Sequence, residues 1–218
     1  MPILHLLAIG IFYFMNTIFW DFLVSMGMAE AWAAFTEYSL LFIIMLIFFG
    51  PKLKVHIKDF REKTKSIWKF LLKAFLVIVA SYLFMQASIF VADKIFHTNI
   101  LPQNNELLEE RAEKVPKIIT FLMMVIYAPF IEEHVFRYSF TGWIKKENKG
   151  LVIGLTILSI IAFDMIHVIH LPEFFYYLPL SLSLTYIYFD KDRNVISSML
   201  MHAMTNALAF LMMLFIGL

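Results

Sequence analysis

Ionisable side chains interrupt an apolar segment at residues 131–137, where the sequence reads IEEHVFR. Glu133 and Arg137 are four residues apart, so on a helix they share a face and can form an ion pair. Glu132 lies about 100° around the helix from its neighbour and has no partner on that helix. Charge inside a membrane helix costs about 3 kcal/mol or more, so such residues usually serve a site. A buried carboxylate without a counter-charge suits a general base.

Two later apolar segments carry further polar side chains at a spacing of one helical turn. Phe163 and His167 share a face in one segment, and His202 and Asn206 share a face in the other. A carboxylate and an imidazole together can deprotonate a water molecule. A second imidazole and a carboxamide can donate hydrogen bonds to the oxyanion that forms when water attacks an amide. Such groups in three separate segments predict one shared polar cavity.

The same residues also allow zinc chemistry. Glu132, His167 and His202 form an acceptable zinc-ligand set with an open fourth position, although the sequence contains no HExxH motif. Asn206 is a poor zinc ligand and a good oxyanion donor, which favours a glutamate-activated water. No cofactor is therefore assigned, and zinc stays open. Serine catalysis is the weaker alternative, because no serine lies in a GxSxG motif. The non-catalytic alternative is a salt-bridge cluster that only locks helices together.

Composition places the chain in a membrane. Of its 218 residues, 61% are hydrophobic and only 16% are charged, whereas soluble domains carry about 25% charged residues. The net charge of +1, without a long basic run, indicates no nucleic-acid partner. The chain has no cysteine, which excludes disulfides and a cysteine nucleophile. Its length predicts a single transmembrane domain, residues 1–218, whose motif-bearing half is 117–218.

The elements that position these residues are predicted to be transmembrane helices, because a span needs about 20 apolar residues. The N-terminal stretch lacks a basic leader and a small-residue cleavage site, so we interpret it as a retained first span. The predicted fold is an all-α polytopic bundle of about seven spans around an intramembrane polar cavity. The spans are 3–24, 31–50, 67–96, 118–143, 151–171, 174–189 and 195–218.

The charges of the connecting segments predict orientation. Lysine and arginine cluster at 52–73, 145–149 and 191–193, and with seven spans these segments fall on one side of the membrane. The positive-inside rule makes that side cytoplasmic. The N-terminus is then cytoplasmic and the C-terminus outside, with the acidic loop 97–116 on the outer side. A composition rich in Lys, Ile, Phe and Asn suits an AT-rich bacterial genome, which predicts a bacterial cell membrane.

Other polar residues within the spans receive weaker assignments. Glu37 lies about two turns into the second span and is a candidate to line the same cavity. His134, Asp164 and His170 are expected at the rim of the site or behind it.

Depth is the difficulty for a shared site. Counted from the cytoplasmic ends at about 1.5 Å per residue, His202 lies at about 10 Å, Glu132 at about 15 Å and His167 at about 24 Å. Helix tilt, or a fifth span that begins before residue 151, must bring these side chains together.

Three motifs carry a resemblance to a known family. They are EExxxR at 132–137, FxxxH at 163–167 and HxxxN at 202–206. In this order, and in late membrane spans, they resemble the motifs of the CPBP family. This family of Abi proteins includes the type II CAAX prenyl endopeptidases and bacteriocin-processing or immunity proteins. The resemblance covers about the C-terminal half of the chain.

The resemblance implies a polytopic membrane endopeptidase with its site in a conical intramembrane cavity. It implies that Glu132 activates water with the assistance of His167, and that His202 and Asn206 stabilise the oxyanion. The supporting residues would be Glu133, Arg137 and Phe163.

Three functions stay open at this point. The first is hydrolysis of a peptide bond in a membrane peptide or a lipid-modified protein. The second is bacteriocin immunity through binding of a membrane toxin or its receptor without obligatory proteolysis, although simple binding needs no unpaired Glu132. The third is an ion-coupled carrier that uses Glu37, Asp164 and Glu132, against which the lack of an internal repeat argues. Natural substrate and oligomeric state are not predicted.

Overall fold

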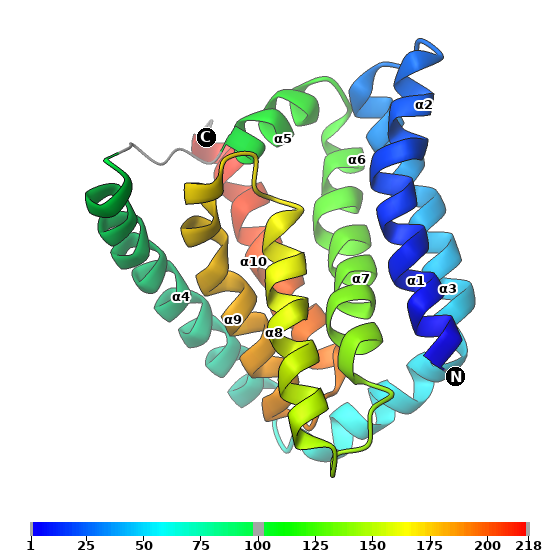
Figure 1. The fold of residues 1–218 in the computed structure, drawn as a ribbon, viewed down its shortest axis with the longest axis vertical. Coiled ribbons are helices and arrows are strands. Elements are labelled where there is room, and N and C mark those ends of the chain that lie inside the picture. The colour runs from blue at the N-terminus through cyan, green and yellow to red at the C-terminus, as the bar shows by residue number, and fades with distance from the viewer. Residues whose placement is uncertain (1, 98–102, 217–218) are drawn as a thin grey trace.

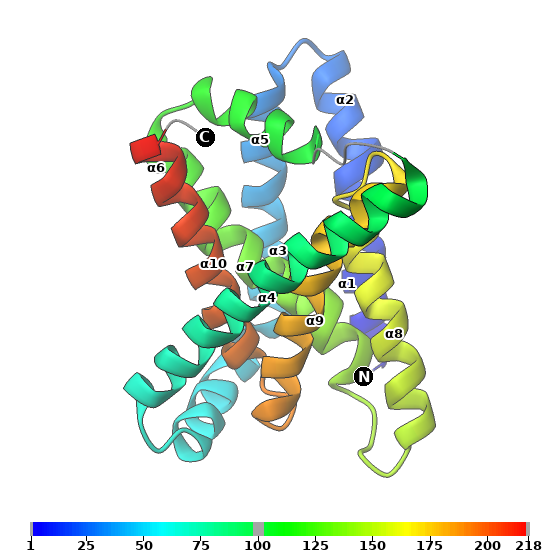
Figure 2. The same ribbon diagram turned by 90° about the vertical axis from the view of Figure 1, so that its left-hand side faces the viewer.

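The computed structural model describes residues 2–97 and 103–216, and every regular element in these ranges is helical. Most helices run along the long axis of the molecule, while α4 (Ile67–Phe96) crosses the bundle obliquely (Figures 1 and 2). The predicted all-α bundle is confirmed.

Within the described ranges, five helices are long and apolar enough to cross a membrane. Two more, α8 (Lys149–Met165) and α9 (Phe174–Asp190), stand where the fifth and sixth spans are predicted. Each has 17 residues and is thus about 25 Å long, which is compatible with seven spans. The first of the five, Pro2–Ser25, is continuous and consists of α1 (Pro2–Phe14), η1 (Met15–Phe19) and α2 (Trp20–Ser25). The other four are α3 (Glu30–Lys63), α4, the helix Lys117–Ser139 and α10 (Val195–Ile216).

The helix Lys117–Ser139 carries the EExxxR motif and is called the motif helix below. It alternates between α and π geometry, in the order α6 (Lys117–Phe121), η2 (Leu122–Tyr127), α7 (Ala128–Glu132) and η3 (Glu133–Ser139). Its α7 and η3 turns contact α1, α3, α8 and α10. The motif helix is therefore packed on several sides, so the charged side chains of its EExxxR motif face other helices within the bundle.

The helix that contains the second predicted span, 31–50, is longer than that span. Helix α3 does not stop at residue 50 but continues through Pro51 to Lys63. The extension forms ion pairs one turn apart, Lys58 with Glu62 and Asp59 with Lys63, and it buries Phe60. Such pairs and an apolar contact stabilise a helix beyond the membrane.

The fifth predicted span, 151–171, needs a correction, because α8 ends at Met165. The backbone N–H of His167 pairs with the Asp164 carbonyl in a tight turn, and the N–H of Ile169 donates to the buried Glu173 carboxylate. His167 thus lies just past the helix end. His170 is exposed and precedes the short turn η4 (Leu171–Glu173).

The acidic loop contains a helix that the sequence analysis does not predict, α5 (Gln103–Glu113). It lies across one end of the bundle (Figure 1). Asn105 bonds to the hydroxyls of Tyr176 and Tyr177 on α9, and Arg111 pairs with Glu30 of α3. Residues 98–102 of this loop, and 217–218 of the last predicted span, lie outside the described residues.

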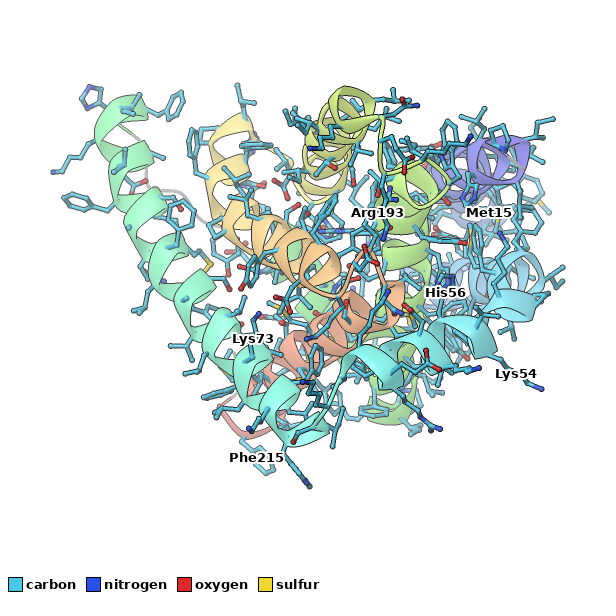
Figure 3. All side chains as sticks on the ribbon, turned by 90° about the horizontal axis from the view of Figure 1, so that it is seen from below. Met15, Lys54, His56, Lys73, Arg193 and Phe215 are labelled. Atoms are coloured by element: carbon cyan, nitrogen blue, oxygen red, sulfur yellow. The ribbon has the colours of Figure 1, made fainter. Side chains whose placement is uncertain are left out.

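The opposite end of the bundle gathers the three basic segments. Asp192 accepts from Lys63 at 3.1 Å and also from Lys146, which joins all three segments at one point. Arg193 donates from Nη1 to the Thr141 carbonyl at 2.9 Å. Seen from this end, Lys54 projects outwards whereas Arg193 lies among the helices (Figure 3).

Candidate active site

A cavity of about 670 Å³ lies between the helices, and the predicted residues Glu132, His167, His202 and Asn206 all line it. Phe163 lines it as well, and α5 covers the far end. His167 follows the end of α8 in a tight turn and reaches the same cavity, so the difference in predicted depth does not keep it apart from the other three residues. The structure therefore brings the four side chains to one space, and their chemical roles stay predictions.

Glu132 has two neighbours from other helices. The Tyr38 hydroxyl of α3 donates to Glu132 Oε1 at 3.4 Å, and Nε2 of His202 lies 3.8 Å from Oε2. The second distance is too long for a hydrogen bond. Glu132 is 3% exposed, and this histidine is the one basic residue within ion-pair distance of it in the part of the chain that the structure describes. Tyr38 is missed by the sequence analysis, because a tyrosine in a membrane helix gives no distinctive signal.

Glu133 and Arg137 stand behind the cavity wall and form the predicted pair, with Arg137 Nε 3.5 Å from Glu133 Oε2. Glu133 also accepts from Nδ1 of His202 at 3.0 Å. Because a carboxylate can only accept, this bond places a proton on Nδ1 and leaves Nε2 facing Glu132. The sequence predicts the ion pair but not this bond, which makes Glu133 the residue that orients His202.

Phe163 joins the three motifs through its ring. The Arg137 guanidinium lies 4.2 Å from the ring centroid, a cation–π distance. The rings of His167 and His202 lie 5.0 and 6.0 Å away. Phe163 is 1% exposed, so it fixes both imidazoles by packing.

His167 has a defined tautomer in its neutral form. Nδ1 lies 2.9 Å from the Phe163 carbonyl, and a carbonyl can only accept, so Nδ1 carries the proton. Nε2 then keeps its lone pair. This is the state in which an imidazole can accept a proton.

Asn206 is held by an irregularity of the motif helix. Its Nδ2 donates to the Met124 carbonyl at 2.8 Å. In the π turn the N–H of Ala128 donates to Met123, five residues back. Pro129 follows and has no N–H to offer Met124, so the Asn206 amide satisfies the free carbonyl. One N–H of the same amide is left for a ligand.

The remaining candidates lie elsewhere, with one exception. His134 is fully buried outside the cavity, stacked on Phe49 at 5.0 Å, and Asp164 is fully buried outside it too. The exception is Glu37, which lines the cavity.

The zinc alternative is neither supported nor removed by the described geometry. Within residues 2–97 and 103–216, no three His, Asp or Glu side chains come together as a metal-ligand group. The bond from Nδ1 of His202 to Glu133 leaves Nε2 free, as in histidines that bind a metal. The chemistry below is derived from the side chains alone.

The fold and the site together define an integral membrane protein with a buried carboxylate–imidazole site in a cavity between helices. Comparison with known proteins gives a family match for part of the chain. Residues 114–208 match the family described as type II CAAX prenyl endopeptidase Rce1-like. The resemblance to the CPBP family is thereby confirmed for the region that carries the motifs, and this family is one of membrane proteases.

One curated relative matches over a longer stretch. It is the UPF0177 protein YaiF of Lactococcus lactis subsp. lactis (strain IL1403), 27% identical over 179 residues, which cover 79% of this chain and 76% of that protein. No solved structure matches the chain significantly.

Proposed function

We propose that this protein is an intramembrane endopeptidase that hydrolyses a peptide bond in a membrane-associated peptide or protein. The observation that carries the proposal is the position of His202, whose imidazole contacts Glu132 and Glu133 at the wall of a cavity that His167 and Asn206 also line. The match to a family of CAAX prenyl endopeptidases supports the protease class.

In the first step a water molecule in the cavity attacks the carbonyl carbon of the scissile bond. Glu132 takes one proton from this water, and Nε2 of His167 accepts a hydrogen bond from it, which orients the attacking lone pair. The Tyr38 hydroxyl donates to the same carboxylate and limits its rotation. The carbonyl oxygen becomes an oxyanion.

Two donors stabilise the oxyanion. One is the free N–H of the Asn206 amide, whose other N–H is fixed to the Met124 carbonyl. The second is Nε2–H of His202, which requires a doubly protonated ring. The Glu133 carboxylate, 3.0 Å from Nδ1, stabilises that cation. Donors held in place before the reaction are effective because they need no reorganisation.

In the second step the tetrahedral intermediate collapses. The carbon–nitrogen bond breaks, and protonated Glu132 delivers its proton to the leaving amine. The products are a peptide with a new carboxyl group and a peptide with a new amino group. Glu132 returns to its starting carboxylate.

Cleavage by purified protein tests the proposal. Synthetic apolar peptides are incubated with wild type, Glu132→Gln and His202→Ala, with and without a chelator, and products are identified by mass spectrometry. We expect cleavage by wild type, none by Glu132→Gln, and no effect of the chelator. Normal cleavage by a folded Glu132→Gln variant would reject the assignment, and loss of activity with chelator would demand a metal.

The side from which the substrate enters follows from the charges. The basic segments lie at one end of the bundle and α5 lies at the other (Figure 1), and residues of α5 line the cavity. By the positive-inside rule the α5 end faces the outside of the cell membrane. The proposed substrate is then a peptide at the outer face.

Because the sequence contains no cysteine, single-cysteine variants test this orientation cleanly. Glu110→Cys on α5 should react with a membrane-impermeant maleimide in intact cells, whereas Lys146→Cys should react only after the cells are permeabilised. The reverse labelling pattern would invert the orientation.

A further inference from the structure

The cavity contains a second buried carboxylate that the proposed reaction does not use. Glu37 of α3 lines the cavity and is 3% exposed. Its Oε1 is buried and has no hydrogen-bond partner among the described residues. An unsatisfied polar atom in a buried place costs about 1–3 kcal/mol, and more for a charged group. A ligand that donates a hydrogen bond to Glu37 Oε1 would remove this cost.

Among the described residues that line the cavity, Arg111 is the one arginine or lysine, and it is already engaged. Arg111 of α5 donates from Nε and Nη2 to Glu30 Oε2 at 3.2 and 3.1 Å. Its guanidinium also lies 5.2 Å from the Trp20 ring. Glu109 and Glu132 add further carboxylates to the lining. Three carboxylates therefore share the described lining with one guanidinium, which is already paired.

Glu37 stands close to the proposed reaction centre along the chain. It precedes Tyr38, whose hydroxyl reaches Glu132, and both residues line the same cavity. On the other side it lies about two turns along α3 from Glu30, which pairs with Arg111 of α5. A substrate held with its scissile bond at Glu132 and extending toward α5 would pass Glu37.

We propose that Glu37 is a specificity-determining residue that binds a cationic nitrogen group of the substrate, either a basic side chain or a free amino terminus. This inference rests on the proposed function and names the substrate class of the same site. The substrate class is then an apolar peptide with one positive charge near its scissile bond. Its apolar residues suit the membrane, and its charge binds the unpartnered Glu37 carboxylate.

The test compares peptides that differ only in charge. A single lysine is scanned along synthetic apolar peptides and replaced at each position by acetyl-lysine, with the amino terminus free or acetylated. For wild type we expect kcat/KM to fall about 30-fold when the recognised cation is neutralised, within the range of about 10- to 100-fold for one charge-assisted hydrogen bond. The arm that shows the fall identifies the source of the cation.

The matched variants are Glu37→Gln and Glu109→Gln, which remove the same charge at two places in one cavity. Glu37→Gln should bring the ratio between charged and neutral peptides to within about threefold of one, and Glu109→Gln should leave the ratio as in wild type. Equal rates for both peptides with wild type, an unchanged ratio in Glu37→Gln, or an equal collapse in both variants would overturn the proposal. If Glu37→Gln does not fold, Glu37→Asp serves, because its shorter side chain should lower the ratio at least threefold.

A binding measurement separates this proposal from the proposed function. Fluorescence anisotropy of the labelled peptides with Glu132→Gln reports recognition without hydrolysis. Preference for the charged peptide in this variant, and its loss in Glu37→Gln/Glu132→Gln, would support the cation site even if no cleavage were found. Equal binding of both peptides would overturn it.

Discussion

The bond between Glu133 and His202 can be separated experimentally from the ion pair between Glu133 and Arg137. The perturbation is Glu133→Gln, which keeps the size of the side chain and removes its charge. The change leaves the Arg137 guanidinium buried without a counter-ion. It also removes the carboxylate that favours a doubly protonated His202.

The magnitude follows from the geometry. Arg137 Nε lies 3.5 Å from Glu133 Oε2, and the two side chains are 2% and 0% exposed. At an effective dielectric constant of about 20 the attraction is about 5 kcal/mol. The Phe163 ring and the Ser181 carbonyl still contact the guanidinium in the variant. We therefore expect a loss of about 3 kcal/mol, at the lower end for a broken buried pair, and a melting temperature lower by about 6–12 °C.

The assay combines thermal unfolding in detergent with peptide cleavage, and the informative control is Glu133→Gln/Arg137→Met. This double variant removes the orphan charge, so it should recover most of the lost stability, since a buried pair is replaced by neutral groups. Cleavage should stay about 100-fold below wild type in both variants, because a neutral amide at position 133 does not stabilise the doubly protonated His202 as a carboxylate does. Stability and activity are thereby uncoupled.

Two results would refute this reasoning. If the double variant is no more stable than Glu133→Gln, an uncompensated Arg137 charge does not explain the loss. If either variant cleaves peptide at the wild-type rate, Glu133 does not act through His202. In that second case, a loss of stability in Glu133→Gln would mean that the carboxylate of Glu133 only stabilises the fold.

Three further predictions concern other groups. Tyr38→Phe removes the donor to Glu132 and keeps the ring, so kcat should fall about tenfold with an unchanged melting temperature; an unchanged kcat would exclude a role for the hydroxyl. Asn206→Asp removes the proposed oxyanion donor, so kcat should fall about 10²- to 10³-fold with little change in KM; a loss confined to KM would contradict this. Lys146 and Lys63 donate to Asp192 and hold the pKa of that carboxyl below its ordinary value. Its stabilising effect is therefore present above about pH 4 and is lost as the pH falls through the lowered pKa. In denaturant titrations the deficit of Asp192→Asn, at most about 1 kcal/mol at this exposed site, should disappear in acid; a deficit that persists in acid would contradict it.

The sequence could predict the all-α architecture and the residues of the cavity because both depend on strong local signals. Long apolar stretches define membrane helices, and charges within them are costly enough to indicate a site. The one-turn spacing of Glu133 and Arg137 held even though that segment is π-helical. Whether the four predicted residues catalyse a reaction is not tested by the fold.

Other features could not be predicted because they depend on contacts between distant segments. The place where α8 ends is fixed partly by Glu173, which follows the turn and accepts from Ile169. Helix α5 is too polar for a span and is anchored by Asn105 to side chains of α9. One local signal was available, since Pro129 within an apolar helix indicates a disturbed hydrogen-bond ladder.

The wide turns of the motif helix have a consequence for the kinds of mutation this protein tolerates. Each residue added to or removed from a helix rotates everything beyond it by about 100° and shifts it by about 1.5 Å. A one-residue deletion within Leu122–Tyr127 would relax the π turn to ordinary α geometry, in which one residue fewer completes the same turn, so Glu132 would keep its direction toward α3 and α10. The Met124 carbonyl would then return to the backbone ladder, and Asn206 would lose its acceptor. Point substitutions among the apolar residues there leave this angular register intact. The length of η2 therefore sets the anchor of Asn206, while the direction of Glu132 tolerates the loss of one residue.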